Sequence, residues 1–302
     1  MSDRISTISI FNTTIRNFGV VQGDIAELTR QISSGREAKD FKGLGTKTRL
    51  ILDLESKLSS AKRYVGDNNI ALVRLNGMKE SIGSLLQIAT SLRNNITIER
   101  SAAQNDLPLA ELSRAQLSQV RDALNKSISG RFLFSGARTD DAPVGDIVNV
   151  SNLSPTTGLP TANYYLGDDG AVEILISDQL TINYGITANN DSIQKLVGAL
   201  HMAINAEGAS DGALESALDL VNEALEGVVG LENEVNNNIQ IISSTNDIHE
   251  NFKTYLNQTL GEEVGVDVVE ATTQLSLNQT LLQATFQNFA RISNLKLVDF
   301  LR

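Results

Sequence analysis

The stretch that decides the fold reads GRFLFSG and spans residues 130–136. Before it, apolar side chains recur at helical spacing; after it come turn residues and β-branched side chains, and helical spacing then returns up to the C-terminus. The chain is therefore expected to run as helix up to this stretch, to reverse direction here, and to return as helix. We predict a helix-to-strand turn at this stretch, marked by Gly130, Phe132, Phe134 and Gly136.

The two ends of the chain carry the same narrow apolar stripe. Apolar residues from Ile8 to Ile32 are spaced by threes and fours, and large ones recur every seven residues; the last helical segment repeats this pattern. Two apolar positions in seven are typical of a coiled coil, whereas a globular helix usually shows a wider apolar face. We predict two terminal coiled-coil helices that assemble through one stripe, formed by Phe11, Phe18, Ile25, Ile32, Leu275, Leu282 and Phe289.

Two long periodic segments lie between these ends. The first runs from about Thr48 to Asn105, with a stripe from Ile51 to Ile96 that includes Lys79 and Arg93. Some 50 helical residues would span roughly 75 Å, far beyond an ordinary globular helix. Leu107-Pro108 interrupts the pattern, a shorter helix follows up to Ile128, and a second long helix carries Leu214 to Leu256. Its seam also contains polar residues that are expected to fix register: Glu232, Asn246 and His249.

Residues 137–189 differ from the rest of the chain. Prolines and glycines divide them into short strand-like runs, and GDDG at 167–170 predicts a turn between two of these runs. Ser177-Asp178 is expected to separate the next pair. The predicted strands are 147–150, 164–166, 171–176 and 179–184.

These patterns define the predicted fold class and its parts. The class is mainly α: an elongated antiparallel helical bundle with terminal coiled-coil helices and a β-rich insert in the middle of the chain. The terminal helices comprise 1–45 plus 262–302, the central bundle 46–136 plus 190–261, and the insert 137–189. The polar segment 36–47 is predicted to connect the first two helices.

Composition and charge limit the function classes. The chain has no Cys, so disulfides and thiol chemistry are excluded. Its net charge is −11, with 22 acidic and 3 basic residues in 137–270 against 13 and 19 in 1–136. The two halves would therefore attract each other in an antiparallel bundle, although acidic faces could equally serve only solubility. No basic stripe with interleaved aromatic residues is present, so nucleic acid is not an expected partner.

The sequence contains no recognisable catalytic, phosphate-binding or metal-binding motif. The two histidines, His201 and His249, do not form a zinc-binding pattern, and GLGTKT at 43–48 lacks the Gly-Lys-Ser/Thr ending of a phosphate-binding loop. Asp168 and Asp169 lack further ligands at calcium-loop spacing. We expect no catalytic, cofactor-binding or metal site. No run approaches 18 apolar residues and no signal peptide is recognisable, so neither a membrane span nor a cleaved leader is expected.

Three stretches carry a resemblance to a known family. LTRQISSGR at 28–36 and QTLLQATF at 279–286 are similar to the terminal helices of the flagellin superfamily. The stretch 130–136, together with YYLGDDG at 164–170, resembles the superfamily's hook-filament junction proteins, also called hook-associated protein 3. The resemblance covers nearly the whole chain and is least close over 137–160. It departs from many relatives at FKGLG, residues 41–45.

The resemblance implies a structural component of the bacterial flagellum, not an enzyme. Members of the family are exported unfolded by the flagellar type III apparatus and assemble outside the cell. They form a homo-oligomeric ring between the hook-side junction protein and flagellin, and an export chaperone binds their C-terminal helix. One alternative is a flagellin subunit of the filament itself. Two others are a secreted enzyme or effector on a flagellin-like frame, and a coiled-coil scaffold unrelated to flagella.

Overall fold

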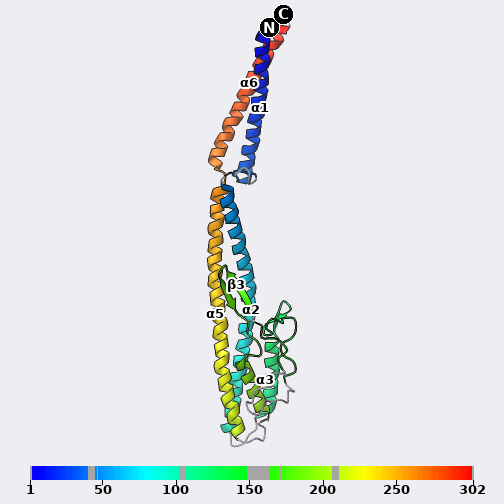
Figure 1. Cartoon of the computed structure of the whole chain (residues 1–302), viewed down its shortest axis with the longest axis vertical. Helices are drawn as coiled ribbons and strands as arrows, with labels where there is room; N and C mark the ends of the chain where they lie inside the picture. The colour runs from blue at the N-terminus through cyan, green and yellow to red at the C-terminus, as the bar shows by residue number, and fades with distance from the viewer. Residues whose placement is uncertain are drawn as a thin grey trace. The chain divides into compact units, whose positions relative to one another are not determined.

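A computed structural model describes residues 2–39, 45, 47–101, 107–147, 164–170, 172–205 and 211–300, with the side chains of 2–8, 10, 11, 211 and 291–300 left aside. These residues form six helices and four short strands. The helices are α1 (Ser2–Ser34), α2 (Thr48–Ser101), α3 (Leu109–Leu124), α4 (Asp191–Asn205), α5 (Asp211–Val264) and α6 (Val268–Phe300), drawn in Figure 1. The predicted mainly helical class is confirmed.

The chain divides into two compact units. Met1–Ser60 and Phe252–Arg302 form one, called here the terminal unit; Ala61–Asn251 forms the other, the central unit. Helices α2 and α5 each contribute residues to both units. The three-part division predicted from the sequence, with its borders near 45 and 262, stays a prediction.

In the terminal unit, α1 and α6 lie side by side (Figure 1). The parts of α2 and α5 that belong to this unit share a small apolar cluster of Leu54, Leu58 and Leu256, with Leu260 packed against it. Asp267 caps α6, because its carboxylate oxygen Oδ1 accepts hydrogen bonds from the backbone N–H groups of Val269 and Glu270 at 2.9 and 3.0 Å.

The central unit contains the large hydrophobic core. Residues from α2, α3, α4 and α5 fill it, and many of their side chains are wholly buried. Helix α4 begins where the sequence predicts, because Asn190 accepts a hydrogen bond from the Ser192 N–H at 3.0 Å. Its first turn approaches α5 closely: a Cβ on Gly227 would lie 1.9 Å from Ser192 Oγ, so α5 needs a glycine there.

Most of the predicted stripe of α2 is buried, including Ile51, Leu75, Ile82 and Ile96, but its two charged positions are not. Lys79 and Arg93, which occur in the predicted stripe, are exposed. The core instead takes their neighbours Met78, Leu85 and Leu92, which are 2% exposed or less. The physical reason is that a long lysine or arginine keeps its charge in water, so the helix turns the adjacent apolar row inward.

The strands form two separate antiparallel hairpins. β1 (Ser127–Ile128) pairs with β2 (Arg131–Phe132), and β3 (Glu173–Ser177) pairs with β4 (Leu180–Asn183). The second hairpin lies where the sequence predicts, but its turn is Asp178-Gln179, because Ser177 still belongs to β3 and pairs with Leu180. The helix predicted to reach Ile128 ends at Leu124 instead, where the backbone passes into β1.

Other predicted strands of the insert differ from the structure. Residues 164–166 contribute only an isolated bridge between Val144 and Tyr165. Ile147 is buried but belongs to no strand, and 148–150 lie outside the described residues. A side chain takes over part of the pairing here: Asn125 donates to the Val144 carbonyl at 2.8 Å and accepts from the Val144 N–H at 3.0 Å.

Candidate assembly surface

The predicted assembly stripe lies where α1 and α6 meet. Among its described side chains, Phe18, Ile25 and Ile32 in α1 are half-buried, as are Leu275, Leu282 and Phe289 in α6. The rings of Phe18 and Phe286 meet edge to face, with centroids 4.9 Å apart. The side chain of Phe11 lies outside the described residues. These stripe residues therefore pair the two terminal helices of one chain.

This seam is loosely filled. Only Ala271, 4% exposed, is fully buried among the described side chains of α1 and α6. An apolar cavity of about 150 Å³ opens between the helices and is lined by Thr14, Ile15, Phe18, Thr285, Phe286 and Phe289. Two helices alone cannot surround each other's side chains, so the seam residues remain partly in contact with water.

The helix pair leaves several large apolar side chains exposed to solvent. Leu277 and Leu281 follow each other by one turn on α6 and are 58% and 47% exposed. Phe286 is 54% exposed, and α1 exposes two further large apolar residues, Ile15 and Val20. Of these residues, Ile15 belongs to the apolar pattern predicted from Ile8 to Ile32, whereas Val20, Leu277, Leu281 and Phe286 lie outside the predicted pattern.

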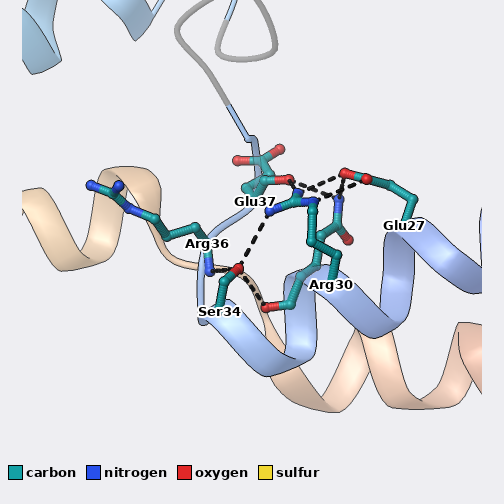
Figure 2. Close-up of polar contacts among 6 residues, drawn as sticks. Glu27, Arg30, Ser34, Arg36 and Glu37 are labelled. Carbon is teal, nitrogen blue, oxygen red and sulfur yellow. Dashed lines mark hydrogen bonds and ion pairs between the residues drawn. The ribbon is translucent and has the colours of Figure 1, made fainter.

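A cluster of polar contacts, the joint cluster, closes the base of the helix pair (Figure 2). It consists of Glu27, Arg30, Gln31, Ser34, Arg36 and Glu37, where α1 ends. Arg30 donates to both carboxylate oxygens of Glu27, at 3.0 and 2.6 Å. Arg30 and Gln31 both donate to the Glu37 carbonyl, at 3.1 and 2.8 Å.

Backbone bonds connect this cluster to the α5–α6 linker. The Glu37 N–H donates to the Val264 carbonyl at 2.9 Å, and the Val266 N–H donates to the Gly35 carbonyl at 3.2 Å. Arg36 and Gly265 form a β-bridge between these two bonds. Gly35 ends α1 with a φ of +67°, a conformation in which glycine carries no steric cost.

Within the joint cluster, Glu27 and Arg30 stabilise each other's charged form. The hydrogen bond from Arg30 is the main reason that the pKa of Glu27 is lowered, and the same bond raises the pKa of Arg30. Both side chains remain in contact with solvent, so the pair contributes geometry more than stability.

The predicted helix-to-strand turn lies in the central unit and packs against residues 167–170. Gly130, with φ +76°, and Ser129, with φ +54°, form the two-residue turn of the β1–β2 hairpin. Phe132 is half-buried in β2, while Phe134 is wholly buried and its carbonyl accepts from the Ala188 N–H at 2.9 Å. The stretch thus starts inside a hairpin and ends in the core.

Gly136 joins this turn to residues 167–170. Asp168 accepts hydrogen bonds from the N–H groups of Ala137 and Gly170 at 2.6 and 3.1 Å, and its own N–H donates to the Ser135 carbonyl. A Cβ on Gly136 would lie 2.1 Å from the Asp168 carbonyl oxygen. The two stretches that resemble junction proteins therefore pack against each other. Asp168 serves as an acceptor for backbone N–H groups.

Polar residues hold the β3–β4 hairpin on α2 and α5. Asn68, wholly buried, donates to the Ile176 carbonyl at 3.3 Å and to Asn246 Oδ1 at 2.9 Å. His249 contacts the same carbonyl through Nε2 at 2.9 Å and stacks on Tyr64. Of the three polar seam residues predicted to fix register, His249 contacts the hairpin, whereas Asn246 of α5 bonds to Asn68 and Asn69 of α2. Glu232 is half-buried.

His201 is buried in α4, and its Nε2 has no hydrogen-bond partner among the described residues. Within that part of the chain, no group of three or more acidic, His or Cys side chains is placed to hold a metal ion. No described helix is long and apolar enough to cross a membrane.

Comparison with known proteins adds to this description. No protein-family model and no curated protein sequence matches the chain. Among solved structures, the mainly helical fold described above has counterparts. One is a Vibrio parahaemolyticus chain provisionally described as a flagellar hook-associated protein. It has a TM-score of 0.59 and 14% identity, over 72% of this chain and 97% of that chain.

A crystal structure of Bacillus cereus FlgL aligns over 72% of this chain and 98% of that chain, with 16% identity and a TM-score of 0.48. That second similarity is too weak to support a conclusion. At 14% identity the Vibrio structure shows a shared fold, and no more than the fold.

Proposed function

We propose that the protein is a structural component of the bacterial flagellum that joins the hook to the filament. In this proposal, copies form a ring through their terminal helices, between the hook-side junction protein and flagellin. The fold shared with the Vibrio hook-associated chain supports a flagellar role. The resemblance of residues 130–136 and 164–170 to junction proteins favours the junction over the filament.

One observation carries the assembly part of the proposal. The α1–α6 pair leaves Leu277, Leu281 and Phe286 about half exposed or more, and its own seam is only partly buried. Exposed apolar side chains at this density mark a surface that another protein covers. The stripe predicted from the sequence forms the pair together with Phe286, and Leu277 and Leu281 point away from it toward neighbouring subunits in this proposal.

The proposal includes export and location. The chain would leave the cell through the flagellar type III apparatus, act outside the cell in the flagellum, and bind an export chaperone through α6 before assembly. An amphipathic helix such as α6 would expose its whole apolar stripe while unpaired, which gives a chaperone a surface to bind. We propose no catalytic activity.

Two outward substitutions test the assembly surface. In the Leu277→Asp/Leu281→Asp chain, α1 and α6 should still pair, because neither residue lies in the seam, but filaments should no longer attach. The matched control is Ile70→Asp/Val73→Asp, which changes two exposed apolar residues of α2 in the central unit; it should leave attachment intact. Normal filaments and swimming in the first variant would contradict the proposal.

Replacing the seam residues is the complementary test. Leu282→Asp/Phe289→Asp should separate α1 from α6, leave the central unit folded, and also abolish filament attachment. Circular dichroism of the purified chain distinguishes this variant from the outward one, since only the seam variant should lose helical signal.

Deletion of the gene separates the two flagellar alternatives. A junction protein is required for attachment, so its loss should release flagellin into the medium and leave bare hooks. If cells without the protein still carry filaments that are merely shorter or thinner, the protein is a filament subunit.

A further inference from the structure

The heptad seam between α1 and α6 does not select one register. The contact of Phe18 with Phe286, and the cavity that Thr14 and Phe289 share, place α1 and α6 antiparallel in a single alignment. This alignment sets Val21 opposite Leu282 and Leu28 opposite Leu275. A slip by one heptad moves α6 about 10 Å along α1 and again places apolar residues opposite each other.

Polar residues in the seam do not remove this ambiguity. Coiled coils often fix register with polar residues that face one another. Here Asn278 lies opposite Ile25 and Thr285 opposite Phe18, so each polar side chain faces an apolar one. After a slip of seven residues Asn278 would face Ile32 or Phe18, which is an environment of the same kind.

The joint cluster supplies what the seam lacks. Glu37 is held from two sides: its carbonyl accepts from Arg30 and Gln31 of α1, and its N–H donates to Val264 at the end of α5. The Val266 N–H is bonded to Gly35, and α6 begins at Val268. The start of α6 is thereby fixed against the end of α1 by bonds that a slip of 10 Å would break.

The distances agree with this assignment. At 1.5 Å per helical residue, Phe18 lies about 27 Å from the bridge at Arg36, and Phe286 lies about 31 Å from Gly265. The two rings meet. The two lengths differ by about 4 Å, less than half of a one-heptad slip of about 10 Å, so the register set at the Arg36–Gly265 bridge is the one in which the rings meet.

We propose that the joint cluster sets the axial register in which the two terminal helices pair. Arg30 and Gln31 act as positioning residues through Glu37. This inference concerns the isolated chain and does not rest on the proposed flagellar function.

Cysteine pairs can report the register directly, because the chain contains no cysteine of its own. Val21→Cys combined with Leu282→Cys reports the present register. Val21→Cys combined with Leu275→Cys or with Phe289→Cys reports a slip by one heptad in either direction. A disulfide requires Cα atoms within about 7 Å, so each pair responds to one register only.

The three pairs are placed in the full chain, oxidised mildly at low protein concentration, and compared in two backgrounds. With the joint cluster intact, the Leu282 pair should close at least roughly tenfold faster than the other two. With Arg30→Ala/Gln31→Ala, a slipped pair should gain by a similar factor and the Leu282 pair should lose, while helicity is retained. Arg16→Ala, which removes an exposed arginine of the same helix, is the matched control and should change nothing.

Three outcomes would overturn the proposal. Unchanged crosslinking in Arg30→Ala/Gln31→Ala would show that the seam sets the register after all. Equal yields from all three pairs in the intact background would show that no register is set. Loss of all three crosslinks together with helicity would show that the cluster holds the helices together without choosing their register.

Discussion

The terminal pair and the central unit use the same apolar periodicity and reach different degrees of burial. In α2 and α5 of the central unit, seam residues such as Leu75, Ile82 and Val228 are wholly removed from solvent, because α3, α4 and the hairpins cover them. In α1 and α6, the corresponding residues Phe18 and Leu282 are only half-buried. The number of neighbouring elements, not the sequence pattern, decides how much apolar area is buried.

This difference assigns distinct roles to the two regions. Burial of apolar area is the main stabilising contribution to a fold, so the central unit has the contacts to be stable in the isolated chain. The terminal pair leaves part of its apolar surface exposed, as expected of a region that gains its remaining contacts on assembly. Four changes would break or sharpen this contrast.

Phe134→Ala should have the largest effect. The side chain is wholly buried in the core of the central unit, and removing a buried phenylalanine costs about 3–5 kcal/mol. Urea denaturation followed by circular dichroism should show the loss. Phe286→Ala, at an exposed aromatic of α6, is the control; an equal loss there would mean that the terminal pair is as tightly packed as the core.

Gly136→Ala should follow. The residue has φ +70°, and its new Cβ would overlap the Asp168 carbonyl oxygen, so we expect a loss of about 2–5 kcal/mol from backbone strain and overpacking. Gly130→Ala has a similar φ of +76° but meets open space, and should lose only about 1–2 kcal/mol. Equal losses in the two variants would contradict the close contact between Gly136 and Asp168.

Leu282→Ala should cost less than a core substitution. A buried leucine changed to alanine loses about 2–5 kcal/mol, and half-burial should bring this to about 1–2 kcal/mol. The loss should appear in the thermal unfolding of α1 and α6, while the transition of the central unit stays in place. The adjacent, outward Leu281→Ala should change stability by no more than about 0.5 kcal/mol.

The smallest effect should come from pH, through His201. Burial lowers the pKa of His201 below its ordinary 6.5, and a bond with the backbone of Ile147 acts weakly in the opposite direction. The unfolded chain therefore binds the proton first as pH falls. The contribution of neutral His201 is fully present above pH 6.5 and is lost as the pH drops below it.

Urea denaturation between pH 8 and 5 should show this loss in the central unit. His201→Gln should remove that component, whereas His249→Gln, at the half-buried histidine beside the β3–β4 hairpin, should retain it. An identical pH dependence in the reference chain and in His201→Gln would contradict the assignment.

Much of the architecture was predictable because helical periodicity is a local property. The presence of helices α1 and α5, the N-cap at Asn190 and the turn near Asp178 follow from residue spacing and capping chemistry. Residues that depend on distant partners were not predictable. Asn125 ends the α3 region by bonding Val144. Asp168, from across the insert, accepts a hydrogen bond from the Ala137 N–H and leaves no room for a side chain at Gly136. No local sequence pattern predicts such pairings.

The candidate site divides in the same way. The heptad stripe identified the residues of α1 and α6 that share one face, but it could not distinguish pairing within the chain from contact with another subunit. Leu277 and Leu281 became candidates only when the structure showed which side of α6 the seam uses. Likewise, Glu27, Arg30 and Glu37 are unremarkable surface charges until the linker after Val264 is brought beside them.

By itself, the sequence determined that the protein is mainly helical, that its ends carry coiled-coil stripes, and that the β3–β4 hairpin lies in the middle of the chain. These features depend on side-chain periodicity and turn residues, which act over a few positions of the chain. Only the tertiary structure decided that the stripes pair within one chain, which apolar residues remain outside, and how the end of α1 is joined to the start of α6. Those outcomes depend on contacts between residues more than 200 positions apart, and spacing along a chain does not encode which distant surfaces meet.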